Sequence, residues 1–146
     1  MNNIFNNKFL CVPFCVWFAI QIVKFITDWI VNKKPNFKRL VGAGGMPSSH
    51  SAVVATLTTL IGQEYGVESG IFAMSCVFSA IVMYDAAGVR RAAGKQATLL
   101  NKLVENAANS GIVVSEKLVE VLGHTPLQVL VGAIIGVLVG LLYGMF

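Results

Sequence analysis

The amino-acid sequence predicts an all-α integral membrane protein, a helical bundle of about four spanning helices with an amphipathic helical segment on its cytoplasmic side. Three observations predict this class. Of the 146 residues, 55% are hydrophobic and only 12% are charged, and the mean hydropathy is +0.72. Soluble domains carry about 25% charged residues, so the composition argues against a soluble enzyme or binding module. We expect a single membrane domain over residues 1–146.

Four apolar stretches define the expected spanning helices, and they run from about Phe9 to Val31, Pro47 to Tyr65, Ser69 to Gly88 and Pro126 to Phe146. Each approaches the ~20 apolar residues that a spanning helix needs. The second has the shortest clearly apolar part, so we expect its N-terminus to begin below the membrane surface. Such a recessed start must line a polar cavity or be covered by protein. The first stretch lacks a small-residue cleavage site and is interpreted as a retained helix.

The segment from about Gly94 to Gly123 differs from these stretches because charged residues interrupt its apolar positions. Apolar residues recur there at helical spacing, namely Leu99, Leu100, Leu103, Val104 and Ala107, with Lys102 and Glu105 between them. This pattern predicts one or two amphipathic helices that lie on the membrane or pack under the bundle. A soluble connector helix is the alternative.

The distribution of charge predicts the orientation of the bundle. Basic residues follow the first and third stretches, namely Lys33, Lys34, Lys38 and Arg39, then Arg90, Arg91 and Lys95. The link between the second and third stretches holds Glu64 and Glu68 and no basic residue. The positive-inside rule then places both basic links in the cytoplasm and both termini outside, in a multi-pass protein of the cell membrane.

The stretch GGMPSSHSA opens the second apolar segment and carries the first candidate site. Gly42, Gly44 and Gly45 allow a close approach of the backbone, and Ser48 or Ser49 can cap the helix that follows. The free N–H groups at the start of that helix would suit a phosphate, with His50 in the first turn beside it. The alternative is a glycine loop with a serine cap and an incidental histidine.

The stretch GHTPLQV predicts the start of the last helix. Thr125 is a capping residue, Pro126 suits the first helical position, and Gln128 completes a capping box. His124 directly precedes this start. The chain has only two histidines, His50 and His124, and the predicted topology puts both at helix starts on the cytoplasmic side. The same topology brings Arg90 and Arg91 to that level.

Several other polar residues are expected to lie on the cytoplasmic side with the two histidines or to point into the bundle interior. Gln21, Lys24 and Asp28 share one face of the first helix, and a polar stripe in a spanning helix normally faces inward. Asp85 ends an apolar span and is expected to pair with an arginine. Arg90 and Arg91 could instead be topological anchors alone. The cysteines, Cys11, Cys15 and Cys76, show no metal-ligand spacing and are expected to be packing thiols.

In their order and spacing, GGMPSSHSA, YDAAGVRRAAGKQA and GHTPLQV together resemble the divergent branch of the type 2 phosphatidic acid phosphatase superfamily, which also includes vanadium-dependent haloperoxidases. The similarity covers most of the chain, from about Gln21 to Gly140. By this resemblance, the run from Pro47 to His50 matches a motif whose histidine protonates the leaving group. His124 matches the histidine nucleophile, and Gln128 falls where the family has the aspartate that orients it.

The resemblance implies a membrane phosphatase, a phosphoric monoester or pyrophosphate hydrolase that acts on a lipid phosphate through a phosphohistidine. His124, His50 and Gln128 would be catalytic. The expected phosphate-binding residues are Gly45, Ser48, Ser49, Arg90, Arg91 and Lys24, with Asp85 beside them. The chemistry implies no metal and no cofactor, and we expect no nucleic-acid partner. A haloperoxidase is disfavoured because it needs a stable vanadate site and a soluble helical body.

Three departures from the family pattern support an alternative function. Gln128 cannot stabilise an imidazolium as a carboxylate does. Leu118 stands at the position of an expected arginine, for which Arg90 or Arg91 would have to substitute. Lys33 and Arg39 are one residue too close to match the remaining motif. The alternative is therefore a non-catalytic membrane protein of the same fold that binds or carries a lipid phosphate.

Glycine recurs every four residues along the last apolar stretch, at Gly132, Gly136, Gly140 and Gly144. These glycines would form one ridge without side chains on a helix of 3.6 residues per turn. Small-residue ridges allow helix backbones to approach closely within a bilayer. We expect the ridge to pack against another helix of the same chain. A homodimer through the ridge is the alternative.

Overall fold

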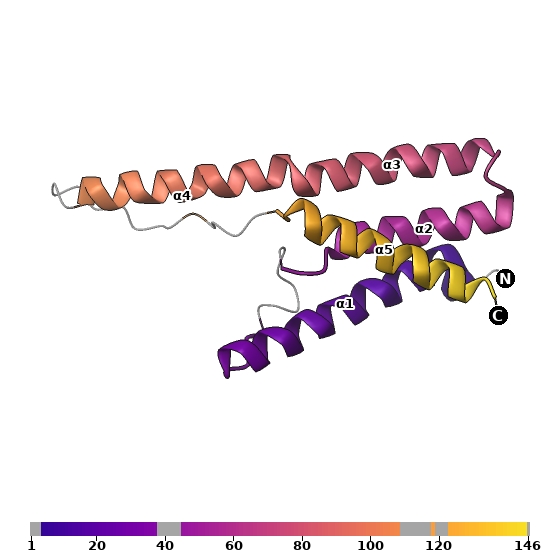
Figure 1. Cartoon of the computed structure of the whole chain (residues 1–146), viewed down its shortest axis with the longest axis horizontal. Coiled ribbons are helices and arrows are strands. Elements are labelled where there is room, and N and C mark those ends of the chain that lie inside the picture. Colours follow the sequence, from indigo (N-terminus) through magenta and orange to yellow (C-terminus); the bar gives the residue numbers. More distant parts are fainter. Residues whose placement is uncertain (1–3, 38–44, 109–117, 119–122, 146) are drawn as a thin grey trace.

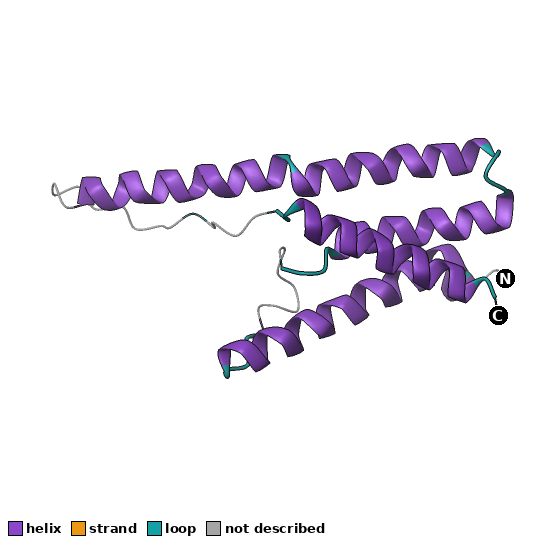
Figure 2. Ribbon diagram, viewed as in Figure 1, coloured by secondary structure: helices purple, strands orange, loops and turns teal. Residues whose placement is uncertain are grey.

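The computed structural model describes residues 4–37, 45–108, 118 and 123–145, and all regular structure in these ranges is helical (Figures 1 and 2). A short 3₁₀ helix, η1 (Ile4–Asn6), precedes five α-helices. These are α1 (Lys8–Asn32), α2 (Ser49–Tyr65), α3 (Gly70–Ala87), α4 (Val89–Ala108) and α5 (Pro126–Tyr143). The predicted all-α class is confirmed.

Three helical stretches of the described chain are long and apolar enough to cross a membrane. They are Lys8–Asn32, the joined helices α3 and α4 over Gly70–Asn106, and Pro126–Tyr143. The fourth predicted span, α2, has 17 residues and is the shortest of the five α-helices. The start of α2 is nevertheless enclosed by protein, because Ser48 directly before it has an exposed fraction of 0%. The helical membrane bundle is thus confirmed, while the count of four spans stays a prediction.

Helix α2 lies at the centre of the bundle and contacts α1, α3 and α5. Its buried residues are mostly small or hydroxylated, namely Ser49, Ser51, Ala52, Val54, Ala55, Thr56, Leu60 and Ile61. On the α3 side, the Thr58 and Ser79 hydroxyls lie 2.8 Å apart, and the Ser79 hydroxyl also donates to the Val54 carbonyl. Small residues and paired hydroxyls are typical of tightly packed membrane helices, because they let backbones approach and leave no polar group unsatisfied.

The glycine ridge of α5 packs against α2, within the same chain. A Cβ atom added at Gly132 would lie 2.3 Å from the Ser48 carbonyl oxygen, and one added at Gly136 would lie 2.3 Å from the Ala52 carbonyl oxygen. Further along, an added Cβ at Gly140 would meet the Thr59 side chain at 2.7 Å. These distances leave no room for any side chain. A homodimer through the same ridge, the alternative from the sequence, would require α2 to be displaced.

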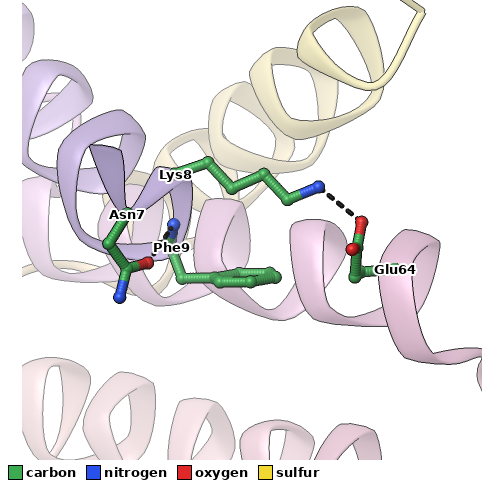
Figure 3. Close-up of polar contacts among 4 residues, drawn as sticks. All are labelled: Asn7, Lys8, Phe9 and Glu64. Atoms are coloured by element: carbon green, nitrogen blue, oxygen red, sulfur yellow. Dashed lines mark hydrogen bonds and ion pairs between the residues drawn. The ribbon is translucent and has the colours of Figure 1, made fainter. Parts of the chain in front are cut away.

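Both described ends of the chain lie at the same end of the bundle as the α2–α3 link (Figure 1). The Lys8 ammonium pairs there with the Glu64 carboxylate, and the Asn7 side chain caps α1 by accepting from the Phe9 N–H (Figure 3). The Phe9 and Tyr65 rings stack at a centroid distance of 5.6 Å. These contacts join the start of α1 to the end of α2. The arrangement agrees with the predicted alternation of helix directions, while the side of the membrane stays a prediction.

Helix α4 differs from its prediction in start and placement. It begins at Val89, directly after α3, and continues in line with it (Figure 1). Among the described helices, α4 contacts α3 alone, so packing under the bundle is wrong for the described part. Gly88 interrupts the helix only locally, because the sequence after it is rich in strong helix formers. Placement on a membrane surface stays a prediction, and residues 109–117 and 119–122 of the predicted segment lie outside the described residues.

Candidate functional site

The start of α2 is built around a buried serine. The Ser48 hydroxyl accepts hydrogen bonds from the Ser51 N–H at 3.3 Å and from the Ser51 hydroxyl at 2.9 Å. It is the N-cap, so the predicted serine cap is confirmed at Ser48. The Ser48 N–H donates to the Gln128 carbonyl at 3.0 Å, which fixes the start of α2 against the first turn of α5.

The start of α5 is held by a capping box. The Thr125 hydroxyl accepts from the Gln128 N–H, and the Gln128 side-chain oxygen accepts from the Thr125 N–H, as the sequence predicts. The His124 N–H donates to the Ala86 carbonyl at the end of α3, at 2.8 Å. Gly123 has φ +85°, and a Cβ added to it would lie 2.4 Å from the Arg91 nitrogen. This close approach between the α3–α4 junction and the chain before α5 requires glycine.

The two histidines of the chain meet where these helix starts come together. Their ring centroids lie 6.1 Å apart with the planes at 64°. His124 is buried, with an exposed fraction of 2%, and His50 is half-buried. His50 Nδ1 and His124 Nε2 are both shielded from solvent and have no hydrogen-bond partner among the described residues. Two neighbouring imidazole rings therefore each hold a buried nitrogen without a partner.

The helix cap determines the tautomer of His124. The Gln128 Oε1 atom must face the Thr125 N–H to close the capping box, and the same oxygen lies 3.3 Å from His124 Nδ1. An oxygen that only accepts requires Nδ1 to carry the proton. His124 Nε2 is then left with a lone pair. This unpartnered nitrogen therefore carries a lone pair, and its ring is held in place by the residue that also starts the helix.

The surroundings of His124 favour its neutral form. Burial lowers the pKa of His124 below its ordinary value, and the positive charge of Lys24 and the nearby His50 lower it further. The Gln128 side chain, within hydrogen-bond distance of the ring, and the nearby Gly45 backbone raise this pKa. The net direction is downward, so the imidazole is neutral at neutral pH.

Lys24 brings a buried positive charge to the start of α2. Its side chain is only 4% exposed, and its ammonium donates to the Ser49 hydroxyl at 3.4 Å. Gln21, one turn away on α1, is also 4% exposed, so the prediction that this polar face points inward is confirmed for both residues. Asp28, the third member of the stripe, is half-buried.

A polar cavity opens beside Lys24. Its volume is about 550 Å³, and it is lined by Lys24, Thr27, Asp28, Val31, Asn32, Gly45 and Met46. Lys24 and Asp28 give this cavity one charge of each sign. Among the described residues, no three His, Cys, Asp or Glu side chains gather into a group that could hold a metal ion.

Arg90 lies at the α3–α4 junction and is paired with Asp85. Its Nε donates to the Asp85 carboxylate at 2.6 Å, which confirms the predicted acid–arginine pair. Arg90 and Lys24 lie close enough to His50 for both positive charges to act on its ring. Arg91 is exposed, and only its backbone is placed near the site, by the contact with Gly123. Of the two arginines, the structure thus brings Arg90 near His50.

Comparison with known proteins identifies the family. The model of the divergent PAP2 family matches residues 5–139, which include every residue of the site described above. The chain belongs to the divergent PAP2 family. An uncharacterized membrane protein of Bacillus subtilis, YuiD, is 42% identical over 137 residues, which are 86% of this chain and 87% of that protein. No solved structure matches the chain. The resemblance seen in the sequence is confirmed, and the chain is a multi-pass membrane protein related to the PAP2 enzymes.

The divergent PAP2 chain places Leu118 away from the histidines. The Asn101 side chain donates to the Leu118 carbonyl and accepts from the Leu118 N–H, both at 2.9 Å. Asn101 lies three turns beyond Arg90 on α4, or about 16 Å along the axis at ~1.5 Å per residue. The backbone at position 118, from which an arginine side chain would extend, is therefore far from the site. Lys38, Arg39, Gly42 and Gly44 lie outside the described residues.

Some contacts of this divergent PAP2 site carry no signal in the sequence. The Ala86 carbonyl that receives His124 belongs to an ordinary alanine, and a backbone acceptor leaves no mark on residue choice. Gly123 does carry a signal, since it stands two residues before the capping residue Thr125 and glycine readily adopts a positive φ. Ser51 could also have been noticed, because it stands three residues after Ser48, at the spacing of a cap partner.

Proposed function

We propose that this protein is a membrane phosphatase that hydrolyses a lipid phosphate or pyrophosphate through a phosphohistidine on His124. One observation carries the proposal. The ring centroids of two imidazoles from sequence-distant helix starts lie 6.1 Å apart, and each ring has a buried nitrogen without a partner. Unsatisfied buried polar atoms are rare in folded proteins and call for a specific explanation. A phosphoryl group bound between the rings would supply both missing partners.

The phosphate would be bound by the start of α2 and by the basic residues around it. The first N–H groups of a helix and its positive dipole end favour an anion. Ser49 and Lys24 lie at this point, joined by their hydrogen bond, and Gly45 lines the adjoining cavity. Arg90, paired with Asp85, would add positive charge near His50. Removing one such donor from a phosphoryl-transfer site costs about 10²–10³ in rate.

In the first chemical step, the His124 Nε2 lone pair attacks phosphorus and the bond from phosphorus to the lipid oxygen breaks. His50 gives its proton to that leaving oxygen, so the lipid alcohol departs neutral. The phosphate dianion beside His50 favours the protonated ring that this role requires. Gln128 accepts from His124 Nδ1 and so leaves the lone pair on the attacking Nε2.

In the second step, water attacks the phosphohistidine. His50, now neutral, takes a proton from the water, whose oxygen forms a bond to phosphorus while the bond to His124 Nε2 breaks. Inorganic phosphate leaves, and both histidines return to their starting states. The same residue acts first as acid and then as base, which is the usual pairing for a two-step displacement.

A non-catalytic lipid-phosphate binder is the second candidate, and two observations favour it. The partner of His124 Nδ1 is the neutral Gln128 amide, which stabilises an imidazolium less than a carboxylate would. Arg90 is already engaged by Asp85, so it is not a free arginine waiting for a phosphate. A protein of this kind would retain the anion site of the family without turnover.

Phosphate release separates the two candidates. Purified protein would be tested against lipid monophosphates and pyrophosphates, with His124→Ala and His50→Ala as controls and EDTA present. A phosphatase should release phosphate in EDTA, lose activity completely in His124→Ala and lose most of it in His50→Ala. Binding of the same lipids without release would establish the non-catalytic function. Activity that EDTA abolishes and magnesium restores would contradict the phosphohistidine scheme.

We infer that the site faces the cytoplasm in the cell membrane. The basic residues at positions 33, 34, 90, 91 and 95 all follow the site-facing ends of their helices, and the positive-inside rule puts such links in the cytoplasm. The substrate would then be a lipid phosphate of the inner leaflet.

A further inference from the structure

An apolar groove runs between α1 and α5 and opens along the side of the bundle. Its volume is about 510 Å³, and its lining is almost wholly hydrocarbon. Helix α1 contributes Val12, Cys15, Val16, Ala19, Ile20 and Val23, α5 contributes Val131, Ile135 and Val139, and the loop before α2 contributes Met46 and Pro47. Within the described part of the chain, no polar side chain lines the groove, so these residues offer no partner for the charged part of a ligand.

The groove adjoins the polar cavity beside Lys24. Met46 lines both spaces, and Gly45 next to it lines the polar one. Pro47 lines the groove and directly precedes Ser48, the cap of the helix where the phosphate is proposed to bind. A molecule with an anionic head at Lys24 would therefore direct its remaining part past Met46 into hydrocarbon surroundings.

The length of the groove corresponds to one leaflet. On α1 it extends from Val12 to Val23, about 16 Å at ~1.5 Å per residue. The hydrocarbon core of a bilayer is about 30 Å thick, so the groove covers roughly half of it. One end of the groove, at Val23, lies beside Lys24, and the other, at Val12, lies about one turn from Lys8, toward the end of the bundle that holds the described termini. A lipid whose phosphate lies at Lys24 would therefore extend its tail along α1, away from the site and into the bilayer.

We propose that the α1–α5 groove binds one hydrocarbon tail of the lipid phosphate, which enters sideways from the bilayer while its phosphate reaches Lys24 and the two histidines. The inference rests on the proposed function and adds the substrate class: a lipid phosphate with a single chain next to its phosphate. A second apolar pocket, between α1 and α2, is lined by residues 9–17 of α1 and shares no lining residue with the polar cavity. It offers no matching place for a second tail.

Filling the groove should affect long substrates selectively. Ile135→Trp places a large ring in the groove, and Leu138→Trp, on the exposed side of α5, is the matched control. For hexadecyl phosphate, Ile135→Trp should raise KM about tenfold or more, because the ring occupies the space of the tail. For butyl phosphate, kcat/KM should change less than twofold in both variants. Equal losses with both substrates, or an unchanged KM for the long one, would overturn the proposal.

Crosslinking tests the same site without turnover and without a substitution in the groove. Hexadecyl phosphate carrying a diazirine at the middle of its chain would be photolysed with the wild-type protein and with His124→Ala. Labels should map to the α1 and α5 residues that line the groove and be competed by hexadecyl phosphate, not by hexadecane. Groove labelling without phosphate release would retain this inference and reject the phosphatase. Labels spread over the lipid-facing surface would reject the inference even for an active enzyme.

Discussion

At the scale of single residues, Gln128 shows how one side chain joins helix structure to chemistry. Its oxygen accepts from the Thr125 N–H to start α5 and from His124 Nδ1 to fix a tautomer. The sequence predicts the cap, because the residue types and spacing are specific. The contact between Gln128 and His124 could also be predicted, but only from the resemblance of the sequence to its family. The consequence for the free Nε2 atom required the structure, since that atom's burial depends on α1, α2 and α5 together.

Replacing Gln128 by glutamate should accelerate hydrolysis. A carboxylate can keep both contacts of the amide oxygen while stabilising the imidazolium that forms as His124 is phosphorylated. We expect kcat to rise roughly tenfold or more, because the carboxylate partner of a catalytic histidine contributes strongly in comparable sites. Steady-state kinetics on Gln128→Glu would measure this, with Gln128→Met as the variant that loses both contacts. An unchanged or lower rate for the glutamate variant would leave Gln128 as a helix cap alone.

The acidic limb of the pH–rate profile should lie below pH 6.5. Attack requires neutral His124, so activity is present above the pKa of this residue and lost as the pH falls through it. Burial and the charge of Lys24 hold that pKa below its ordinary value of 6.5. Lys24→Met removes a positive charge and should move the limb of kcat/KM toward higher pH. Lys95→Met, on exposed α4, is the control, and equal limbs in all three proteins would exclude Lys24 as a cause.

At the scale of elements, α2 explains why the shortest helix occupies the centre. Its serines, threonines and alanines let α5 approach until glycine is the only residue that fits opposite Ser48 and Ala52. The sequence predicts the ridge and its need for a partner, but the identity of that partner depends on tertiary packing. The extent of α4 could not be predicted from its apolar spacing, because Gly88 caps α3 and α4 then begins at once, in line with it.

Substitutions in the glycine ridge should destabilise the protein more as the new side chain becomes larger. At Gly136, even an added Cβ would lie 2.3 Å from the Ala52 carbonyl oxygen, so the two backbones must separate. Gly136→Ala should destabilise the protein by about 1–3 kcal/mol, the usual range for overpacking. Gly136→Leu should prevent folding. Thermal unfolding in detergent would measure both, with Val137→Leu on the exposed side of α5 as the control. A folded monomer of Gly136→Leu in place of a wild-type dimer would instead support the homodimer.

At the scale of the whole molecule, the helix directions divide the protein into two ends. One end holds both described termini, the Lys8–Glu64 pair and the acidic α2–α3 link. The other holds both histidines, Arg90 and the ends of α1 and α3. The sequence predicts this division from alternating apolar stretches and clustered charge, with no knowledge of packing. It could not predict that Lys24 would bond Ser49, because that pairing depends on the angle between α1 and α2.

Cysteine labelling from the two sides of the membrane would test the orientation that this division implies. In a variant without Cys11, Cys15 and Cys76, single cysteines would replace Lys34, Lys95 and Glu68, which are all exposed. An impermeant maleimide added outside cells should label only the cysteine at position 68, and positions 34 and 95 should react only after the membrane is opened. The basic links cannot cross the bilayer as readily as the acidic one, so they remain in the cytoplasm. Labelling of positions 34 and 68 from the same side would mean that α2 does not cross, and the two histidines would then lie at a depth that a lipid phosphate of the inner leaflet does not reach.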